Sequence, residues 1–234
     1  MTFTRYTVNF GGYDWLEETP YPGVCISGFP DIPPPKWKTL WYQRGEVLQR
    51  SHKANSRYCK LHPHVWFDLR DITLYHDANV RLKVPPEAFI DFLGDCDIAA
   101  FLHPQRDCIY DEAVICAECG AADPDRIAAQ TFTYLHDGYP RNNGLHAGTV
   151  LVRRDTPQIR ALSALWWEQL QKHTYRDQLS FDYCLWKLGI ECATIPGNLG
   201  RNDLIERVAH ARTPKPFWES AGHGKSEIGH SPSE

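Results

Sequence analysis

Short apolar runs and stretches with helical periodicity alternate along the chain. Runs rich in β-branched and aromatic residues predict strands. The predicted strands are 5–10, 24–27, 37–42, 72–76, 97–101, 149–152 and 192–195. Apolar residues spaced three or four apart predict helices. The predicted helices are 85–93, 124–137, 157–170 and 176–188, with a polar, basic, helix-like stretch at 43–60.

Local signals mark the helix boundaries. Asp123-Pro124 and Thr156-Pro157 each combine an N-cap residue with a proline at the first helical position, and glycines follow three of the predicted helices. The alternation of strands and helices predicts an α/β fold with a mostly parallel sheet flanked by helices. We expect a single domain over residues 1–212 and a weakly ordered tail over 213–234.

Composition narrows the class of protein. The chain has 234 residues, of which 42% are hydrophobic and 23% charged, which is enough for a packed core. The formal net charge of −4 excludes a general attraction to nucleic acid. A phosphate ligand would therefore need a local basic patch or a metal ion. Because no apolar run approaches the roughly 20 residues that span a bilayer, and residues 1–10 lack a signal-peptide core, we expect a cytoplasmic protein without a membrane span.

The cysteines admit two interpretations. The chain contains 8 of them, several within apolar runs where a free thiol packs as a small hydrophobe. Cys116 and Cys119 form a C-x-x-C pair, with Cys96 and Cys108 upstream. A structural zinc site uses such residues, so zinc is the less favoured alternative to free thiols.

A D-x-N motif follows the strand 72–76. Asp77 and Asn79 flank Ala78, directly after that strand. In open α/β sheets ligands bind beyond the carboxyl ends of the strands, and hard divalent cations take oxygen ligands together with substrate phosphates. The motif therefore predicts a Mn²⁺ or Mg²⁺ site, and a simple strand-ending turn is the alternative.

Two further segments suggest a ligand site. The small residues of 142–148 allow a backbone to approach a ligand, or alternatively serve a tight connection to the next strand. Asp177 lies at the start of a predicted helix, where a carboxylate either caps the helix or deprotonates an acceptor hydroxyl. His210 is a weaker candidate for a metal ligand.

Polar residues gather in two other places. The segment 103–112 is dense in charged groups directly after a predicted strand, and forms either a pocket wall or a solvated loop. Arg57, Lys60 and His62 form a sparse basic cluster before the D-x-N strand. Such side chains bind phosphate groups or lie on a solvated helix face.

Taken together, the ordered motifs indicate a family. Six short motifs occur in order over residues 4–212: Y-T-V-N-F-G-G-Y-D, S-R-Y-C-K-L-H-P-H, D-A-N-V, H-P-Q-R-D-C-I-Y-D-E-A, G-Y-P and Y-R-D-Q-L-S-F. The series resembles the TOD/MUCI glycosyltransferase-like domain family. That family is similar to GT-A glycosyltransferases, which use a nucleotide-sugar donor and usually Mn²⁺ on a Rossmann-like sheet.

The resemblance implies roles for the candidate residues. Asp77 and Asn79 stand at the GT-A D-x-D motif, His210 matches a late metal ligand, and Asp177 matches the catalytic base of inverting members. Asn79 departs from the pattern, because an amide is a neutral ligand and should weaken metal binding. The predicted donor-binding and nucleotide-binding residues are Phe10, Gly11, Gly12, Tyr13, Asp14, Arg57, Lys60, His62, Asp77, Ala78, Asn79, Gly144, Leu145, His146, Ala147 and Arg176. The predicted acceptor or sugar pocket consists of His103, Arg106, Asp107, Tyr110, Glu112 and Gln178.

The sequence thus predicts an enzyme that moves a sugar from a nucleotide-sugar, preferably a UDP-sugar, to a hydroxyl acceptor such as a glycan. Two alternatives remain. The substitution at Asn79 is compatible with a non-catalytic nucleotide-binding or glycan-binding module. The cysteines are compatible with a zinc-stabilised hydrolase.

Overall fold

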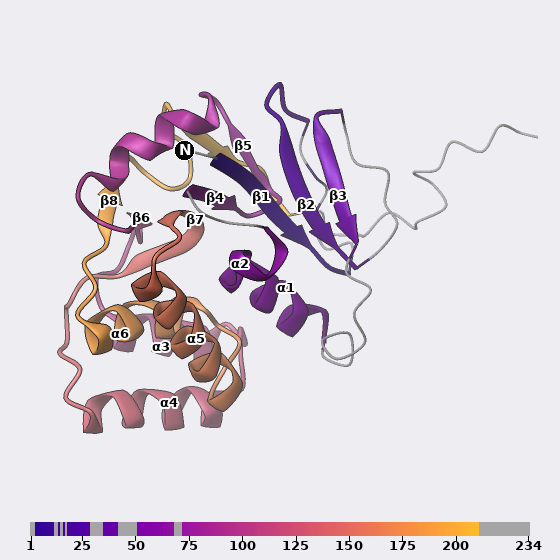
Figure 1. Cartoon of the computed structure of the whole chain (residues 1–234). Helices are drawn as coiled ribbons and strands as arrows, with labels where there is room; N and C mark the ends of the chain where they lie inside the picture. The colour runs from indigo at the N-terminus through magenta and orange to yellow at the C-terminus, as the bar shows by residue number, and fades with distance from the viewer. Residues whose placement is uncertain are drawn as a thin grey trace, which may run out of the picture.

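The computed structural model describes residues 3–11, 14, 16, 18–28, 35–41, 51–67 and 72–210. These residues form a 7-stranded sheet of order β3-β2-β1-β4-β7-β6-β8 and a 2-stranded sheet of β5 and β9 (Figure 1). The strands are β1 (Phe3–Asn9), β2 (Gly23–Ser27), β3 (Trp37–Trp41), β4 (Ile72–His76), β5 (Val80–Leu82), β6 (Ile98–Leu102), β7 (His146–Arg154), β8 (Ala193–Ile195) and β9 (Ile205–Arg207). The helices are α1 (His52–Leu61), α2 (Pro63–Trp66), the 3₁₀ helix η1 (Pro86–Leu93), α3 (Ile109–Glu118), α4 (Pro124–His136), α5 (Pro157–Lys172) and α6 (Gln178–Leu188).

The large sheet is mostly parallel, with one reversed strand. β1 to β4 pair in parallel, as do β6 and β8, whereas β7 is antiparallel to both β4 and β6. The predicted fold class, an α/β domain with a mostly parallel sheet flanked by helices, is therefore confirmed.

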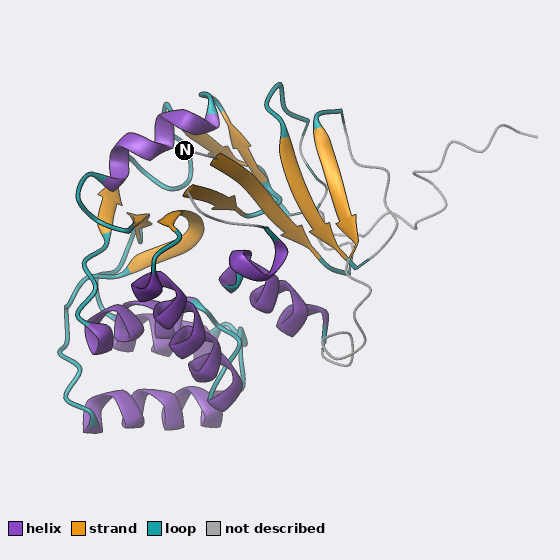
Figure 2. Cartoon of the chain, in the orientation of Figure 1, coloured by secondary structure: helices purple, strands orange, loops and turns teal. Residues whose placement is uncertain are grey.

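The two faces of the sheet bury different partners. Tyr75 and Leu151 belong to the larger apolar cluster, which includes residues of α3, α4, α5 and α6. Their strand neighbours Leu74 and Val152 belong to a second cluster with η1, β5 and β9. Figure 2 shows α3 to α6 on one side of the sheet and η1 on the other. Because side chains alternate along a strand, these central strands are buried on both faces.

Several helix boundaries follow the local chemistry predicted from the sequence. The Asp123 carboxylate accepts a hydrogen bond from Arg126 N and so caps α4. The Thr156 hydroxyl accepts one from Ile159 N and caps α5. Gly189 ends α6 in the left-handed conformation, at φ 62°. Each of these boundaries lies within one or two residues of its predicted position.

Other predictions need correction. β7 begins at His146 rather than at residue 149, so the expected loop 142–148 is partly strand. Helix α6 begins at Gln178 instead of residue 176. The strands β5 and β9 were not predicted, because three residues are too few to show a period. The helix-like stretch 43–60 is helical from His52, and residues 42–50 lie outside the described part.

Two further expectations concern the ends of the chain and the membrane. The predicted tail, 213–234, lies outside the described residues, so the domain boundary at 212 stays a prediction. Within the described part, no helix combines the length and apolar character needed to cross a bilayer.

Trp166 is central to the larger cluster. Its ring stacks on Phe181 at 4.2 Å between centroids, and its Nε1 donates a hydrogen bond to the Asp177 carbonyl at 3.2 Å. Trp166→Ala should lower the free energy of unfolding by about 3–5 kcal/mol, because it leaves a cavity and an unpaired carbonyl. Urea unfolding measures this change. Phe132→Ala, at a ring that is 70% exposed, should change stability by less than about 0.5 kcal/mol. Equal losses in the two variants would contradict this assignment.

Candidate functional site

The candidate site lies where β4 ends. Asp77 follows β4, and its backbone N–H donates to the Thr149 carbonyl of β7 at 2.9 Å. The Tyr75 hydroxyl donates to Asp77 Oδ1 at 2.7 Å. The Asp77 side chain is only partly buried. One carboxylate oxygen is thus held in place at the carboxyl end of a parallel strand, which is where α/β sheets bind ligands.

A buried histidine fixes the backbone at Asp77. Arg5 Nε donates to His76 Nε2 at 2.9 Å, so His76 Nδ1 carries the ring proton and donates to the Asp77 carbonyl at 2.9 Å. The Arg5 guanidinium lies 4.0 Å from the centre of the Trp37 ring. Burial and the Arg5 charge lower the pKa of His76 to about 3, so its ring is neutral. These buried contacts fix the backbone orientation of the D-x-N motif.

Asn79 is anchored but keeps one free acceptor. Its Nδ2 donates to the Val208 carbonyl at 2.9 Å, and Val208 N donates to the Asn79 carbonyl at 2.8 Å. Its Oδ1 is buried and has no hydrogen-bond partner in the described part of the chain. The same contact brings the segment of His210 to this edge, where His210 Nδ1 lies 2.8 Å from Asp14 Oδ1. Residues predicted for metal and nucleotide binding therefore meet although 196 positions separate them.

The described residues contain no group of three His, Cys, Asp or Glu side chains close enough to hold a metal ion. Asp77 and His210 thus do not share such a group with a third residue of these types. The four cysteines 96, 108, 116 and 119 do not form one either, and the Cys116 thiol instead donates to Glu112 at 3.4 Å. The geometry of the described residues therefore gives the zinc alternative no support.

A buried charge cluster lies beside Asp77. Lys60 of α1 donates to Asp177 Oδ2, and Arg57 Nε lies 3.3 Å from Asp177 Oδ1. Burial alone would raise the pKa of Asp177, but the charges of Arg57 and Lys60 outweigh it and hold the pKa well below its usual range. Both cations also interact with the charge of Asp77. Asp177 occupies the N-cap position of α6 but makes no side-chain capping bond to the helix, because its carboxylate is paired with the two cations.

Gly148 makes room for this cluster. A Cβ atom on Gly148 would lie 2.8 Å from Lys60 Nζ and 3.4 Å from Asp177 Oδ2. The close contact at Gly148 is thus with side chains of the protein itself and lies within β7, and the approach of 142–148 to a ligand stays a prediction. The pairing register between β6 and β7 shifts at Ala100 and Phe101, as in a β-bulge. Ala147 belongs to the apolar cluster on the η1 side. Its neighbours His146 and Gly148 face the helices α1 and α6.

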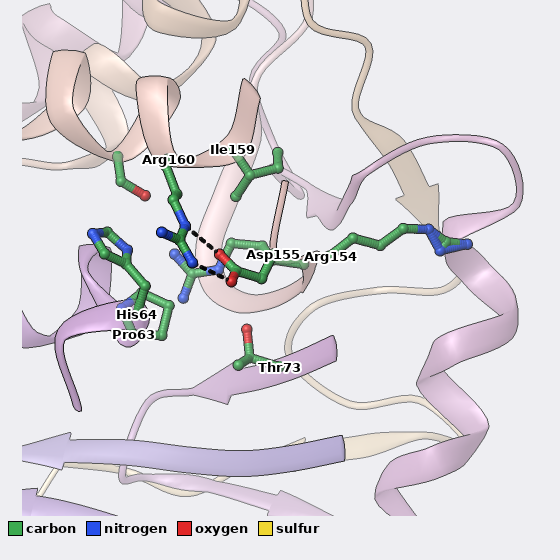
Figure 3. A pocket seen from close by; sticks show the side chains of 9 residues that line it. Pro63, His64, Thr73, Arg154, Asp155, Ile159 and Arg160 are labelled. Atoms are coloured by element: carbon green, nitrogen blue, oxygen red, sulfur yellow. Dashed lines mark hydrogen bonds and ion pairs between the residues drawn. The ribbon is translucent and has the colours of Figure 1, made fainter. Parts of the chain in front are cut away.

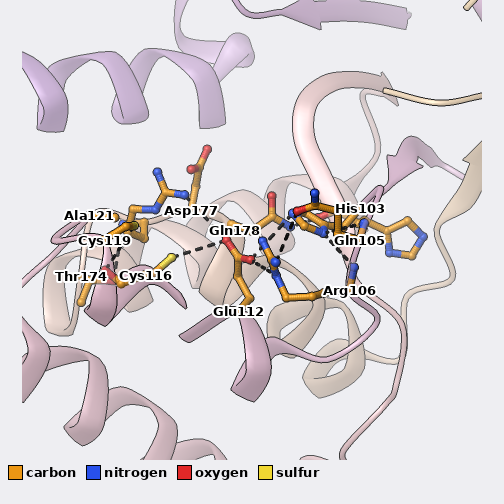
Figure 4. A network of polar contacts seen from close by, with 12 residues as sticks. His103, Gln105, Arg106, Glu112, Cys116, Cys119, Ala121, Thr174, Asp177 and Gln178 are labelled. Atoms are coloured by element: carbon orange, nitrogen blue, oxygen red, sulfur yellow. Dashed lines mark hydrogen bonds and ion pairs between the residues drawn. The ribbon is translucent and has the colours of Figure 1, made fainter. Parts of the chain in front are cut away.

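Several predicted pocket residues converge on Glu112 (Figure 4). Arg106 Nε donates to Glu112 Oε2 at 2.6 Å, and His103 Nε2 lies 3.7 Å from the same oxygen. Arg176 Nη2 lies 3.9 Å from Glu112 Oε1. Gln178 Nε2 donates to the His146 carbonyl. These contacts join the predicted acceptor residues of α3 to the start of α6.

Other predicted site residues lie elsewhere. Tyr110 is buried, and its hydroxyl donates to the Tyr139 carbonyl at 2.8 Å, whereas the Asp107 side chain is exposed. His62 stacks on Tyr58 at 4.4 Å between centroids, where burial lowers its pKa to about 4.

Four of the predicted donor-site residues are buried and apolar: Phe10, Ala78, Leu145 and Ala147. Gly11 and Gly144 adopt positive φ angles. Gly12 and Tyr13 lie outside the described residues.

Sequence reasoning missed one side chain that contacts the site. Asp182 of α6 accepts hydrogen bonds from His146 N at 2.8 Å and from His146 Nδ1 at 2.6 Å. It is 4% exposed and lies among apolar residues of the helix. The signal in the sequence was an aspartate within an apolar stretch of the predicted helix. A carboxylate at such a position is buried and needs a partner.

A small pocket lies away from this site (Figure 3). It is lined by Thr73 of β4 and by Arg153 and Arg154 at the carboxyl end of β7. Thr73 pairs with Arg153 in the sheet, so this pocket lies at the opposite end of the strands from Asp77. Arg160 and Asp155 form a two-point ion pair there, at 2.8 and 2.6 Å.

Comparison with known proteins gives the class of the chain. A family model described as TOD1/MUCI70, glycosyltransferase-like domain, matches residues 36–210. Similar solved structures include the bifunctional glycosyltransferase WbbM in its apo form, with a TM-score of 0.47 and 13% identity. That match covers 82% of this chain and 38% of WbbM, so the chain spans well under half of that protein. Mouse xyloside xylosyltransferase 1 in its apo form matches with a TM-score of 0.45 and 10% identity, over 82% of this chain and 84% of the other. No curated protein sequence matches the chain.

The chain is a glycosyltransferase-like domain. It belongs to the TOD1/MUCI70 family, as the family model matches well over half of its length. The resemblance seen in the ordered sequence motifs is thereby confirmed, and the α/β architecture agrees with the GT-A fold that the resemblance implies.

The Gly148 contact predicts that the stability effects of substitutions at Gly148 and Lys60 are not additive. Gly148→Ala should lower the free energy of unfolding by about 1–3 kcal/mol, because the new methyl group displaces Lys60 from Asp177. In a Lys60→Met background most of that loss should vanish, since the displaced ammonium is gone. A double-mutant cycle by urea unfolding measures the coupling, and simple additivity would contradict the contact.

The buried neutral His76 predicts a pH dependence of stability. Its folded pKa of about 3 lies below the ordinary histidine value, so the unfolded chain binds the proton more tightly. Its contribution is complete above pH 6.5 and is lost as the pH falls towards 3, by about 3 kcal/mol at pH 4. His76→Gln should therefore flatten the decline of unfolding free energy between pH 7 and 4, while exposed His136→Gln should not. Identical slopes in the two variants would refute a neutral buried ring.

Proposed function

We propose that this domain transfers a sugar from a nucleotide-sugar donor, preferably a UDP-sugar, to a hydroxyl acceptor such as a glycan. The observation that carries the proposal is that Tyr75, which holds the Asp77 carboxylate, also has its ring centre 5.0 Å from Lys60 Nζ, and that Arg57 shares the ion-pair partner of Lys60, in a chain of a glycosyltransferase-like family. A carboxylate for a cation and two basic side chains suit a diphosphate. An acidic protein needs such a local arrangement to bind one.

The residues at the D-x-N motif fit a hard divalent cation. Asp77 offers a carboxylate, and the buried Asn79 Oδ1 is an oxygen acceptor without a partner in the described part of the chain. His210 reaches the same edge through the contact between Val208 and Asn79. Mn²⁺ or Mg²⁺, when bound here, would neutralise negative charge that develops on the leaving nucleotide diphosphate. A site with few protein ligands agrees with a cation that relies on substrate phosphates.

The cluster of Arg57, Lys60 and Asp177 places positive charge at the donor side of the site before a donor binds. Asp177 holds Arg57 and Lys60 at fixed positions, so their charges are in place before a donor arrives. Such preorganised charges stabilise a developing anion without reorganisation during the reaction. The two ion pairs also make the Asp177 carboxylate a weak proton acceptor, because they lower its pKa. Its role as catalytic base stays a prediction.

The acceptor side is built from hydrogen-bonding groups. His103, Arg106 and Glu112 form a connected network, and Gln178 separately donates to the His146 carbonyl of β7. Sugar hydroxyls both donate and accept hydrogen bonds, and this mixture of side chains offers both kinds of partner. The network therefore supports a carbohydrate or another polyhydroxy acceptor.

A non-catalytic binding module is the second candidate. The neutral ligand at Asn79 favours it, because an amide binds a divalent cation more weakly than a carboxylate does. Incubation of the protein with UDP-sugars and GDP-sugars in the presence of Mn²⁺ separates the two functions. Transfer or donor hydrolysis supports the enzyme, whereas donor binding without either reaction supports the module.

Asp77→Asn tests the donor site directly. The change keeps the side-chain size but removes the charge, and it should weaken Mn²⁺-dependent nucleotide-sugar binding by roughly tenfold or more. The fold should remain, because Asp77 is only partly buried. Isothermal titration with and without Mn²⁺ measures the affinity, and Asp91→Asn, at an exposed carboxylate of η1, is the matched control. Unchanged affinity in Asp77→Asn would remove Asp77 from the site.

A further inference from the structure

One histidine at the site is held in a single orientation. Asp182 Oδ1 lies 2.6 Å from His146 Nδ1, and Asp182 Oδ2 accepts a hydrogen bond from His146 N at 2.8 Å. An ionised carboxylate only accepts hydrogen bonds, so the ring proton lies on Nδ1. The two-point contact therefore fixes both the tautomer and the plane of the imidazole, and leaves Nε2 as a proton acceptor.

The Nε2 atom is open to a ligand. The His146 side chain is 14% exposed, and within the described part of the chain its ring bonds to Asp182 through Nδ1 only. The Asp182 side chain, by contrast, is 4% exposed. This is the arrangement of an oriented general base: a buried carboxylate behind the ring and an accessible nitrogen in front of it.

The ring lies beside the proposed donor site. His146 and Gly148 face the same side of β7, two residues or roughly 6–7 Å apart, and Gly148 borders the Lys60–Asp177 pair. Gln178 and Asp182, one turn apart on α6, both bind His146, at its carbonyl and at its nitrogens. The helix that begins at Asp177 thus also holds His146.

We infer that His146 is the group that takes the proton from the acceptor hydroxyl, and that Asp182 is its positioning residue. This inference rests on the proposed glycosyl transfer. The acceptor O–H proton passes to His146 Nε2 while the acceptor oxygen forms a bond to the anomeric carbon. The bond from that carbon to the donor diphosphate breaks, and its electron pair leaves with the nucleotide. Asp182 stabilises the imidazolium that results.

Comparison with Asp177 favours His146 for this step. The Asp177 carboxylate is paired with Arg57 and Lys60, whose charges depress its basicity. His146 instead has the Asp182 carboxylate at its Nδ1, where that carboxylate stabilises an imidazolium formed during the step. The other titratable groups near the pair are His103 after β6, Tyr139 before β7, Cys184 on α6 and Cys192 before β8. Burial raises the pKa of Tyr139, Cys184 and Cys192, so these three groups are neutral at neutral pH.

The test is a pH profile of kcat for sugar transfer, with UDP-sugar and Mn²⁺ at saturation. His146→Gln should lower kcat by roughly 10²–10⁴-fold and abolish the decline of the wild-type rate at acidic pH. Asp182→Asn should lower kcat with little change in donor affinity, because its amide nitrogen would face Nδ1 and move the ring proton to Nε2. His136→Gln, at an exposed histidine, should leave the profile unchanged.

A second measurement reads the tautomer of His146 directly and does not require turnover. Nitrogen chemical shifts of the histidine rings should show His146 protonated at Nδ1 in the wild type and at Nε2 in Asp182→Asn. Wild-type transfer with an intact acidic decline in His146→Gln overturns the inference but leaves the proposed function standing. Donor binding without any transfer or hydrolysis by the wild type overturns the proposed function, and the inference with it. A wild-type ring protonated at Nε2 overturns the role of Asp182.

Discussion

The buried contact of Lys60 and Arg57 with Asp177 is the interaction on which the site depends. It joins α1 to the start of α6 across β7, at a point where a Cβ atom on Gly148 would lie 2.8 Å from Lys60 Nζ. Each partner would be costly to bury alone, because an unpaired charge in the interior loses its hydration without compensation. Held together, they present positive charge close to Asp77 while remaining within a packed core.

The reversed strand β7 explains how distant segments reach one edge. Its neighbours β4 and β6 run the other way, so the amino end of β7 lies beside their carboxyl ends. His146 and Gly148 thereby arrive next to Asp77 and His103. The carboxyl end of β7, with its arginines, lies at the opposite edge beside a separate pocket. An antiparallel strand within a parallel sheet thus adds a second source of polar side chains to the ligand-binding edge.

Rigid support runs beneath the accessible groups. His76 and Arg5 hold the backbone of Asp77, and Tyr75 holds its carboxylate. Asp182 holds His146 in the same manner from α6. In both cases a buried, hydrogen-bonded side chain restricts a partly exposed one, which reduces the reorganisation needed when a ligand binds. The two supported groups, Asp77 and His146, come from neighbouring strands of the sheet.

The sequence by itself determined the class of fold, the helix caps at Asp123 and Thr156, and the motif at Asp77, because these depend on local chemistry and on periodicity. Only the tertiary structure decided that Asp177 is paired with two cations, that Tyr110 and Leu145 are buried, and that Asp182 binds His146. These facts depend on strand order, strand direction and the bulge between β6 and β7, which bring together residues that are far apart in the chain. No local pattern encodes that choice of partner, since a buried carboxylate looks the same in sequence whichever group pairs with it.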